Sequence, residues 1–122
     1  MNQLSFNEKY RKRTKLLAIE VLKLYDELPK NEITRIIGRQ LIRSATSIGA
    51  NFRATCQARS EKERLAKFGI VMEESDETLY WLELLEESHL KISVSDKIKK
   101  EANELTRVFS ATRKTLKNKL KK

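Results

Sequence analysis

The sequence predicts an all-α protein, an up-down-up-down left-handed four-helix bundle that forms one domain over residues 1–122. The 122 residues include only three Gly and one Pro, and 35% of them are charged, a composition typical of long helices. Apolar residues recur at steps of three and four along four segments, and the connections between these segments are short. Sustained spacing of this kind indicates the side-chain packing and the left-handed twist of coiled-coil-like bundles.

The first half of the chain predicts helices over residues 6–28 and 33–58. Pro29 separates them, because an interior proline would break a helix. Gly costs about 1 kcal/mol relative to Ala inside a helix, so Gly38, Gly49 and Gly69 are expected at close approaches between helices. The inward positions of the two helices are Tyr10, Leu17, Val21, Leu24 and Leu28, and Ile33, Ile37, Leu41, Ser44, Ile48 and Phe52.

The second half predicts helices over residues 61–89 and 95–118. Ser60 and Glu63 have the spacing of a capping box at the start of the third helix, and Ser95 or Ser93 can cap the fourth. The residues from Lys117 to Lys122 are expected to fray. The inward positions are Leu65, Phe68, Met72, Ser75, Leu79 and Leu82, and Ile98, Ala102, Leu105, Phe109, Thr112 and Leu116.

The sequence contains few residues or motifs that could support catalysis. The one Cys, Cys56, and the one His, His89, belong to the ends of different predicted helices, and His89 follows Glu86 at a spacing that di-iron bundles use twice. No glycine-rich phosphate loop or nucleophile elbow is present. We therefore expect no catalytic residues, no metal, no cofactor and no small-molecule substrate.

The cysteine count and the hydropathy pattern indicate the compartment. A single Cys excludes a disulfide within the chain and fits a reducing environment. No segment approaches the roughly 18 to 20 uninterrupted apolar residues of a membrane span. We expect a cytoplasmic protein without membrane contact.

The chain carries a formal net charge of +9, which favours a polyanionic partner. Between Glu32 and Glu61 there is no acidic residue, and Arg35, Arg39 and Arg43 share one face of the second helix. These arginines either read phosphates or pair with the acidic third helix, and pairing is the expectation for Arg39 and Arg43. The acids of the third helix are Glu73, Glu74, Asp76, Glu77, Glu83, Glu86 and Glu87.

Two further basic clusters lie near the ends of the chain. In an up-down bundle the start of the first helix and the end of the fourth meet at one end of the molecule. The sequence assigns only Glu8 as an acid beside these clusters, so they are the candidate contact for RNA, with a merely solubilising surface as the alternative. The candidate RNA-binding residues are Lys12, Arg13, Arg53, Arg113, Lys114 and Lys117.

Two segments carry a family resemblance. Residues 39–53, RQLIRSATSIGANFR, and residues 80–85, YWLELL, resemble the four-helix-bundle proteins encoded in intervening sequences of bacterial 23S ribosomal RNA genes. The resemblance implies a homopentamer, no known catalysis and an association with ribosomal RNA. The accessory proteins of diversity-generating retroelements are similar bundles, which leaves a subunit that binds reverse transcriptase and RNA as an alternative. A scaffold that binds only protein is a third.

Polar and aromatic residues in the same segments suggest two structural roles. Ser44, Ser47 and Asn51 lie on or beside the inward face of the second helix, where polar groups need partners. We expect Glu74 or Glu77 to meet Arg43 or Asn51 in a buried polar layer that fixes register. The third helix carries more aromatic and apolar residues than one inward face needs, which predicts a subunit interface between copies of this chain. The interface residues are Tyr80, Trp81 and Leu84.

Overall fold

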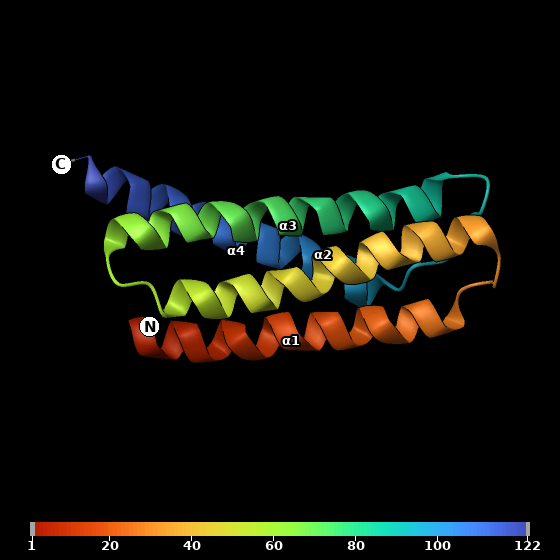
Figure 1. Cartoon of the computed structure of the whole chain (residues 1–122), viewed down its shortest axis with the longest axis horizontal. Helices are drawn as coiled ribbons and strands as arrows, with labels where there is room; N and C mark the ends of the chain where they lie inside the picture. Colours follow the sequence, from red (N-terminus) through yellow and green to blue (C-terminus); the bar gives the residue numbers. More distant parts are fainter. Residues whose placement is uncertain (1, 122) are drawn as a thin grey trace.

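The computed structural model describes residues 2–121, and within that range it contains four α-helices and no strand (Figure 1). The helices are α1 (Gln3–Glu27), α2 (Glu32–Cys56), α3 (Glu61–Glu87) and α4 (Asp96–Leu120). This architecture confirms the all-α four-helix prediction. None of these helices is long and apolar enough to cross a bilayer.

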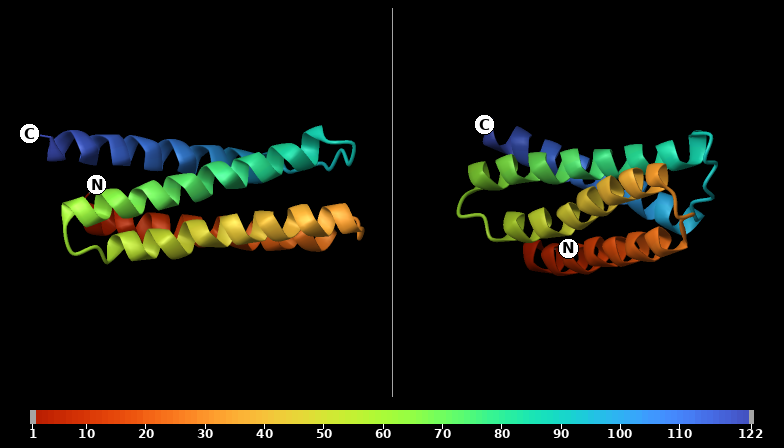
Figure 2. Two further views of the ribbon diagram at one scale, coloured as in Figure 1. Left: turned by 45° about the horizontal axis from the view of Figure 1, so that its top comes forward. Right: turned by 45° about the vertical axis from the view of Figure 1, so that its right-hand side comes forward.

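Each helix runs antiparallel to the one before it. The start of α1, the α2–α3 connection and the end of α4 therefore lie at one end of the bundle, which we call the terminal end (Figures 1 and 2). The α1–α2 and α3–α4 connections lie at the opposite end. Helix α2 packs against α1 and α3, and α3 packs against α4, whereas α1 and α4 share the smallest contact.

Side chains that bond to free backbone N–H groups fix the start of each helix. Ser60 and Ser95 cap α3 and α4 as predicted, accepting hydrogen bonds from the backbone N–H of Glu63 and Ile98. The carboxylate of Glu63 pairs with Arg59 and Lys67 instead of accepting from the backbone N–H of Ser60, so only the Ser60 half of the predicted capping box forms.

The predicted helix boundaries lie within three residues of the observed ones. Helix α1 begins three residues earlier than predicted because the Asn2 side chain accepts a hydrogen bond from the backbone N–H of Ser5. Helix α3 ends at Glu87, before His89. The expected fraying from Lys117 is wrong, since α4 continues to Leu120. Lys122, the last of the residues expected to fray, lies outside the described range.

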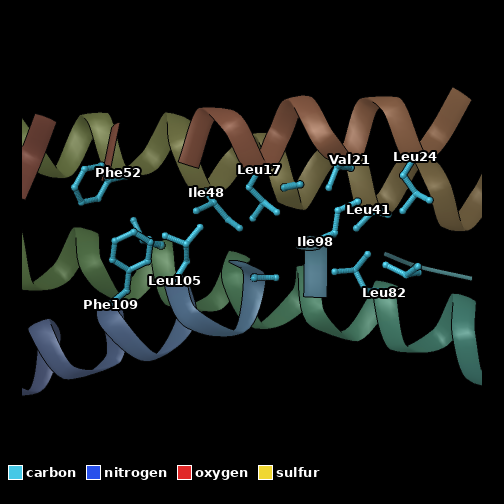
Figure 3. Packing of buried hydrophobic residues seen from close by; sticks show 14 of the residues in the cluster. Leu17, Val21, Leu24, Leu41, Ile48, Phe52, Leu82, Ile98, Leu105 and Phe109 are labelled. Atoms are coloured by element: carbon cyan, nitrogen blue, oxygen red, sulfur yellow. The ribbon is translucent and has the colours of Figure 1, made fainter. Parts of the chain in front are cut away.

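A continuous apolar core runs between the helices (Figure 3). Leu17, Val21 and Leu41 are at most 1% exposed. The inward assignment of Ile33 is wrong: Ile33 is 46% exposed, and Thr34 takes the inward position, with its hydroxyl bonded to the Pro29 carbonyl.

An aromatic layer closes the core near the terminal end. Every helix contributes to the layer, which consists of Tyr10, Phe52, Phe68 and Phe109, and Phe6 of α1 packs beside Tyr10 and Phe52. The Phe52 and Phe109 rings stack with centroids 5.3 Å apart, and the Phe68 centroid lies 6.3 Å from that of Phe52. The Tyr10 and Phe109 rings meet edge to face at 5.8 Å. The layer joins all four helices at one level.

The three glycines differ in how closely other atoms approach them. A Cβ at Gly38 would lie 2.5 Å from Cε1 of Tyr25, and a Cβ at Gly49 would lie 3.3 Å from Oγ1 of Thr14. At Gly69 the nearest atom would be Nε of Arg113 at 3.7 Å, which is an ordinary contact. The expectation of a close approach at all three glycines is therefore wrong for Gly69.

We predict that Gly38→Ala lowers the free energy of unfolding by about 1 kcal/mol. The displaced Tyr25 ring outweighs the gain of about 1 kcal/mol in helix propensity. Gly69→Ala is the matched control and should stabilise the protein by about 0.5 to 1 kcal/mol, because nothing obstructs its methyl group. Urea unfolding measures both, and a stabilised Gly38→Ala variant would contradict the packing described.

Candidate nucleic-acid interface

The outward face of α4 carries a row of exposed cations that we call the basic face of α4. Its members are Lys100, Arg107, Lys114 and Lys117. Steps of seven and three residues place them on one side of the helix. The ion pairs of α4 involve Lys97, Lys99 and Lys119 instead, and none of the four pairs with a carboxylate of residues 2–121. The basic face of α4 is thus free to meet an external anion.

Arg113 occupies a different position from its neighbour Lys114. Its side chain is half-buried beside Gly69 of α3, and its Nε is buried with no hydrogen-bond partner among the described residues. Lys114 and Lys117 are exposed. Of the α4 candidates, Lys114 and Lys117 therefore lie on the outward face, and Arg113 lies between α3 and α4.

Arg13 is held inside the protein and forms the main polar link between α1 and α4. Its Nη2 lies 2.5 Å from Oε1 of Glu101 and 3.2 Å from Oε1 of Glu104, while its Nε donates to Oε2 of Glu101 at 3.0 Å. The side chain is 19% exposed, and the Glu101 hydrogen bonds raise the pKa of Arg13. Assigning Arg13 to a free RNA-binding cluster opposed only by Glu8 is therefore wrong.

Lys12 and Arg53 are exposed and lie beside a groove between α1 and α2. Lys12 is 75% exposed and only loosely paired with Glu8 at 3.8 Å. The groove has a volume of about 600 Å³, and Thr14, Ala18 and Gly49 are small residues that line it. Its lining also includes four basic side chains: Arg11, Lys12, Lys15 and Arg53.

The arginines of α2 differ in whether they pair with α3. Nη1 of Arg43 lies 3.1 Å from Oε2 of Glu74, and Nη2 contacts Glu77, so Arg43 pairs with α3. Arg35 and Arg39 are exposed and form no ion pair within residues 2–121. The expectation of pairing is therefore wrong for Arg39.

The polar residues that we expected to form one buried layer are only partly buried. Arg43 has a 49% exposed side chain, so its ion pairs lie at the rim. Asn51 donates to the backbone carbonyl of Ser47 in its own helix and meets neither Glu74 nor Glu77. The buried contact joins the hydroxyls of Ser44 and Thr78, 3.0 Å apart. Thr78 is absent from the predicted polar layer, although its place on the inward side of α3 was a usable signal.

The three residues assigned to a subunit interface differ in exposure. Tyr80 is 54% exposed and its ring meets that of Trp81 edge to face, with centroids 4.9 Å apart. Trp81 and Leu84 are partly buried against the core. Nε1 of Trp81 is buried and has no hydrogen-bond partner within the described residues.

The groups with the greatest chemical reactivity are far apart. Cys56 ends α2 at the terminal end, and His89 follows α3 at the opposite end (Figure 1). Burial raises the pKa of the Cys56 thiol, which disfavours the reactive thiolate. No group of three His, Cys, Asp or Glu residues within residues 2–121 could hold a metal ion.

Comparison with known proteins gives this bundle a family. The family model for the 23S rRNA-intervening sequence protein matches residues 7–111. This chain belongs to the 23S rRNA-intervening sequence protein family. The basic face of α4 extends beyond this match, since Lys114 and Lys117 follow residue 111.

A crystal structure supports the 23S rRNA-intervening sequence assignment. That protein has unknown function and comes from the S23 ribosomal protein family of Bacteroides thetaiotaomicron. It is similar to this chain with a TM-score of 0.74 and 29% sequence identity, over 85% of this chain and 97% of the other. No curated protein matches the sequence.

We predict that Arg13→Gln destabilises this 23S rRNA-intervening sequence protein by about 1 to 2 kcal/mol, because Glu101 loses a charge-assisted double hydrogen bond. Lys12→Gln, the adjacent exposed control, should change stability by less than about 0.5 kcal/mol. Thermal and urea unfolding measure both. Equal effects from the two variants would show that Arg13 does not link α1 to α4.

Proposed function

We propose that this chain is a non-enzymatic, homo-oligomeric protein that associates with RNA through the basic face of α4. The carrying observation is the row of exposed cations without carboxylate partners on one side of that helix. Family membership supports RNA as the anion, since the family is described by the 23S rRNA intervening sequence. The net charge of +9 favours the encounter.

The chemistry of the basic face of α4 supports contact with the RNA backbone. Arg107 can contact a phosphate through two parallel hydrogen bonds, and lysines contribute compact positive charges. Sequence-specific RNA recognition commonly stacks bases on exposed aromatic rings. The exposed ring of Tyr80 belongs to α3, so the basic face of α4 offers charge and shape.

The separation of reactive groups supports a role without catalysis. Cys56 and His89 lie at opposite ends of the bundle, so they cannot form a nucleophile and base pair within one copy. We accordingly assign no cofactor and no small-molecule substrate.

Exposed apolar side chains support self-assembly, and the family resemblance favours a pentamer. The Arg43 ion pairs with Glu74 and Glu77 set the register of α2 against α3. Because α2 and α3 are antiparallel, the residue seven positions before Arg43 on α2 lies opposite the residues seven positions after Glu74 and Glu77 on α3. Ile36, which is 56% exposed, thus lies level with Trp81 and Leu84. An apolar patch of this kind marks a protein contact.

The test is RNA binding by fluorescence anisotropy across a salt series, with an RNA hairpin from a 23S intervening sequence as the probe. The variant combines Arg107→Gln, Lys114→Gln and Lys117→Gln. We expect binding about tenfold weaker near 0.15 M salt, and a log-log salt slope shallower by about 2 to 3, because three phosphate contacts are lost.

The control removes the same charge at the opposite end of the bundle. It combines Lys30→Gln, Arg35→Gln and Lys91→Gln, which are all exposed. This control should bind RNA like the parent protein. Equal weakening by both variants would contradict the RNA contact on α4. Absence of RNA binding by the parent would favour a scaffold that binds only protein.

A further inference from the structure

Two oppositely charged faces on α2 and α3 are left without partners in the chain. The basic face of α2 consists of Arg39, Thr46 and Arg53, and the acidic face of α3 consists of Glu73, Tyr80 and Glu87. Both faces follow steps of seven residues, so each set lies along one side of its helix. All six residues are exposed.

Neither face is neutralised inside the molecule. The ion pairs that join α2 to α3 use Arg43, Glu74 and Glu77. Arg39, Arg53, Glu73 and Glu87 form none with residues 2–121, and neither do Asp76 and Glu83, which flank the acidic face of α3. Each face therefore presents charges that are available to a second molecule.

We propose that the acidic face of α3 of one copy docks along the basic face of α2 of the next copy. This inference deepens the homo-oligomer of the proposed function and rests on it. The two faces match in length, because their outer charges are separated by 14 residues, or about 21 Å of helix, in each case. Opposite charges at both ends of a contact fix its register and exclude like-charged partners.

The groove between α1 and α2 can receive side chains of the docked helix. Thr46 and Arg53 line this groove, which holds about 600 Å³ beside the small residues Ala18 and Gly49. Tyr80 is the midpoint of the acidic face, as Thr46 is of the basic face, so its 54% exposed ring reaches the contact beside the groove. Lys12 and Lys15, on the α1 side of the groove, are within the region that Asp76 and Glu83 would approach.

The contact joins two different surfaces, which determines how copies add to one another. Each copy offers the basic face of α2 and the acidic face of α3, so the contact can repeat from copy to copy and close into a ring. The basic face of α4 is not used and stays available to RNA in the assembled protein.

The test is the mass of the assembled protein, measured by light scattering and sedimentation velocity at low and high salt. One variant carries Arg39→Glu and Arg53→Glu, and a second carries Glu73→Lys and Glu87→Lys. A third carries all four substitutions, which restores charge complementarity with the signs exchanged and keeps the parent net charge. Lys30→Glu with Lys91→Glu is the control for the first variant, and circular dichroism reports folding.

We expect the parent and the control to assemble, and each two-residue variant to need at least about tenfold higher concentration to do so. The four-residue variant should assemble like the parent. If the parent assembles and both two-residue variants assemble equally well, this contact is wrong and the proposed function stands. A monomeric parent at tens of micromolar would instead overturn the homo-oligomer of the proposed function and this contact with it.

Discussion

A layer of aromatic rings from all four helices holds this bundle together at one level. Tyr10, Phe52, Phe68 and Phe109 lie with neighbouring centroids 5.3 to 6.5 Å apart, and Phe52, Phe68 and Phe109 are fully buried. Large buried rings contribute more apolar contact than other side chains, and their edge-to-face and offset geometry adds orientation. A helix cannot slide along its neighbours without breaking this layer, so the layer determines which charged residues of different helices meet.

The register set by the aromatic layer determines which charged residues pair within one copy. Arg13 of α1 reaches Glu101 of α4, and Arg43 of α2 reaches the acids of α3, so these cations are already paired within one copy. What remains outside is asymmetric: α4 carries free cations, while α2 and α3 carry free charges of opposite sign. The unpaired charges form three separate surfaces. We propose that the basic face of α4 meets RNA, and that the basic face of α2 and the acidic face of α3 meet a second copy.

Local patterns predicted most of the fold, and distant contacts decided most of the site. The steps of three and four identified all four helices, and Ser60 and Ser95 marked two helix starts, because periodicity and capping are properties of neighbouring residues. The partner of Arg13 lies 88 residues away, so no local pattern could show that this cation is occupied. Likewise, Gly38 and Gly69 look alike in sequence, and only the position of the Tyr25 ring distinguishes them.

Under the proposed function, the packing of the helices decides which cations are free to bind RNA. Lysine acetylation footprinting of the parent protein, with and without the 23S intervening-sequence hairpin, tests this claim residue by residue and is compatible with the assembled state. RNA should protect Lys100, Lys114 and Lys117 on α4, and leave Lys30 and Lys91 at the opposite end as reactive as before. Protection of Lys30 and Lys91 with no change on α4 would contradict an RNA contact on the basic face of α4.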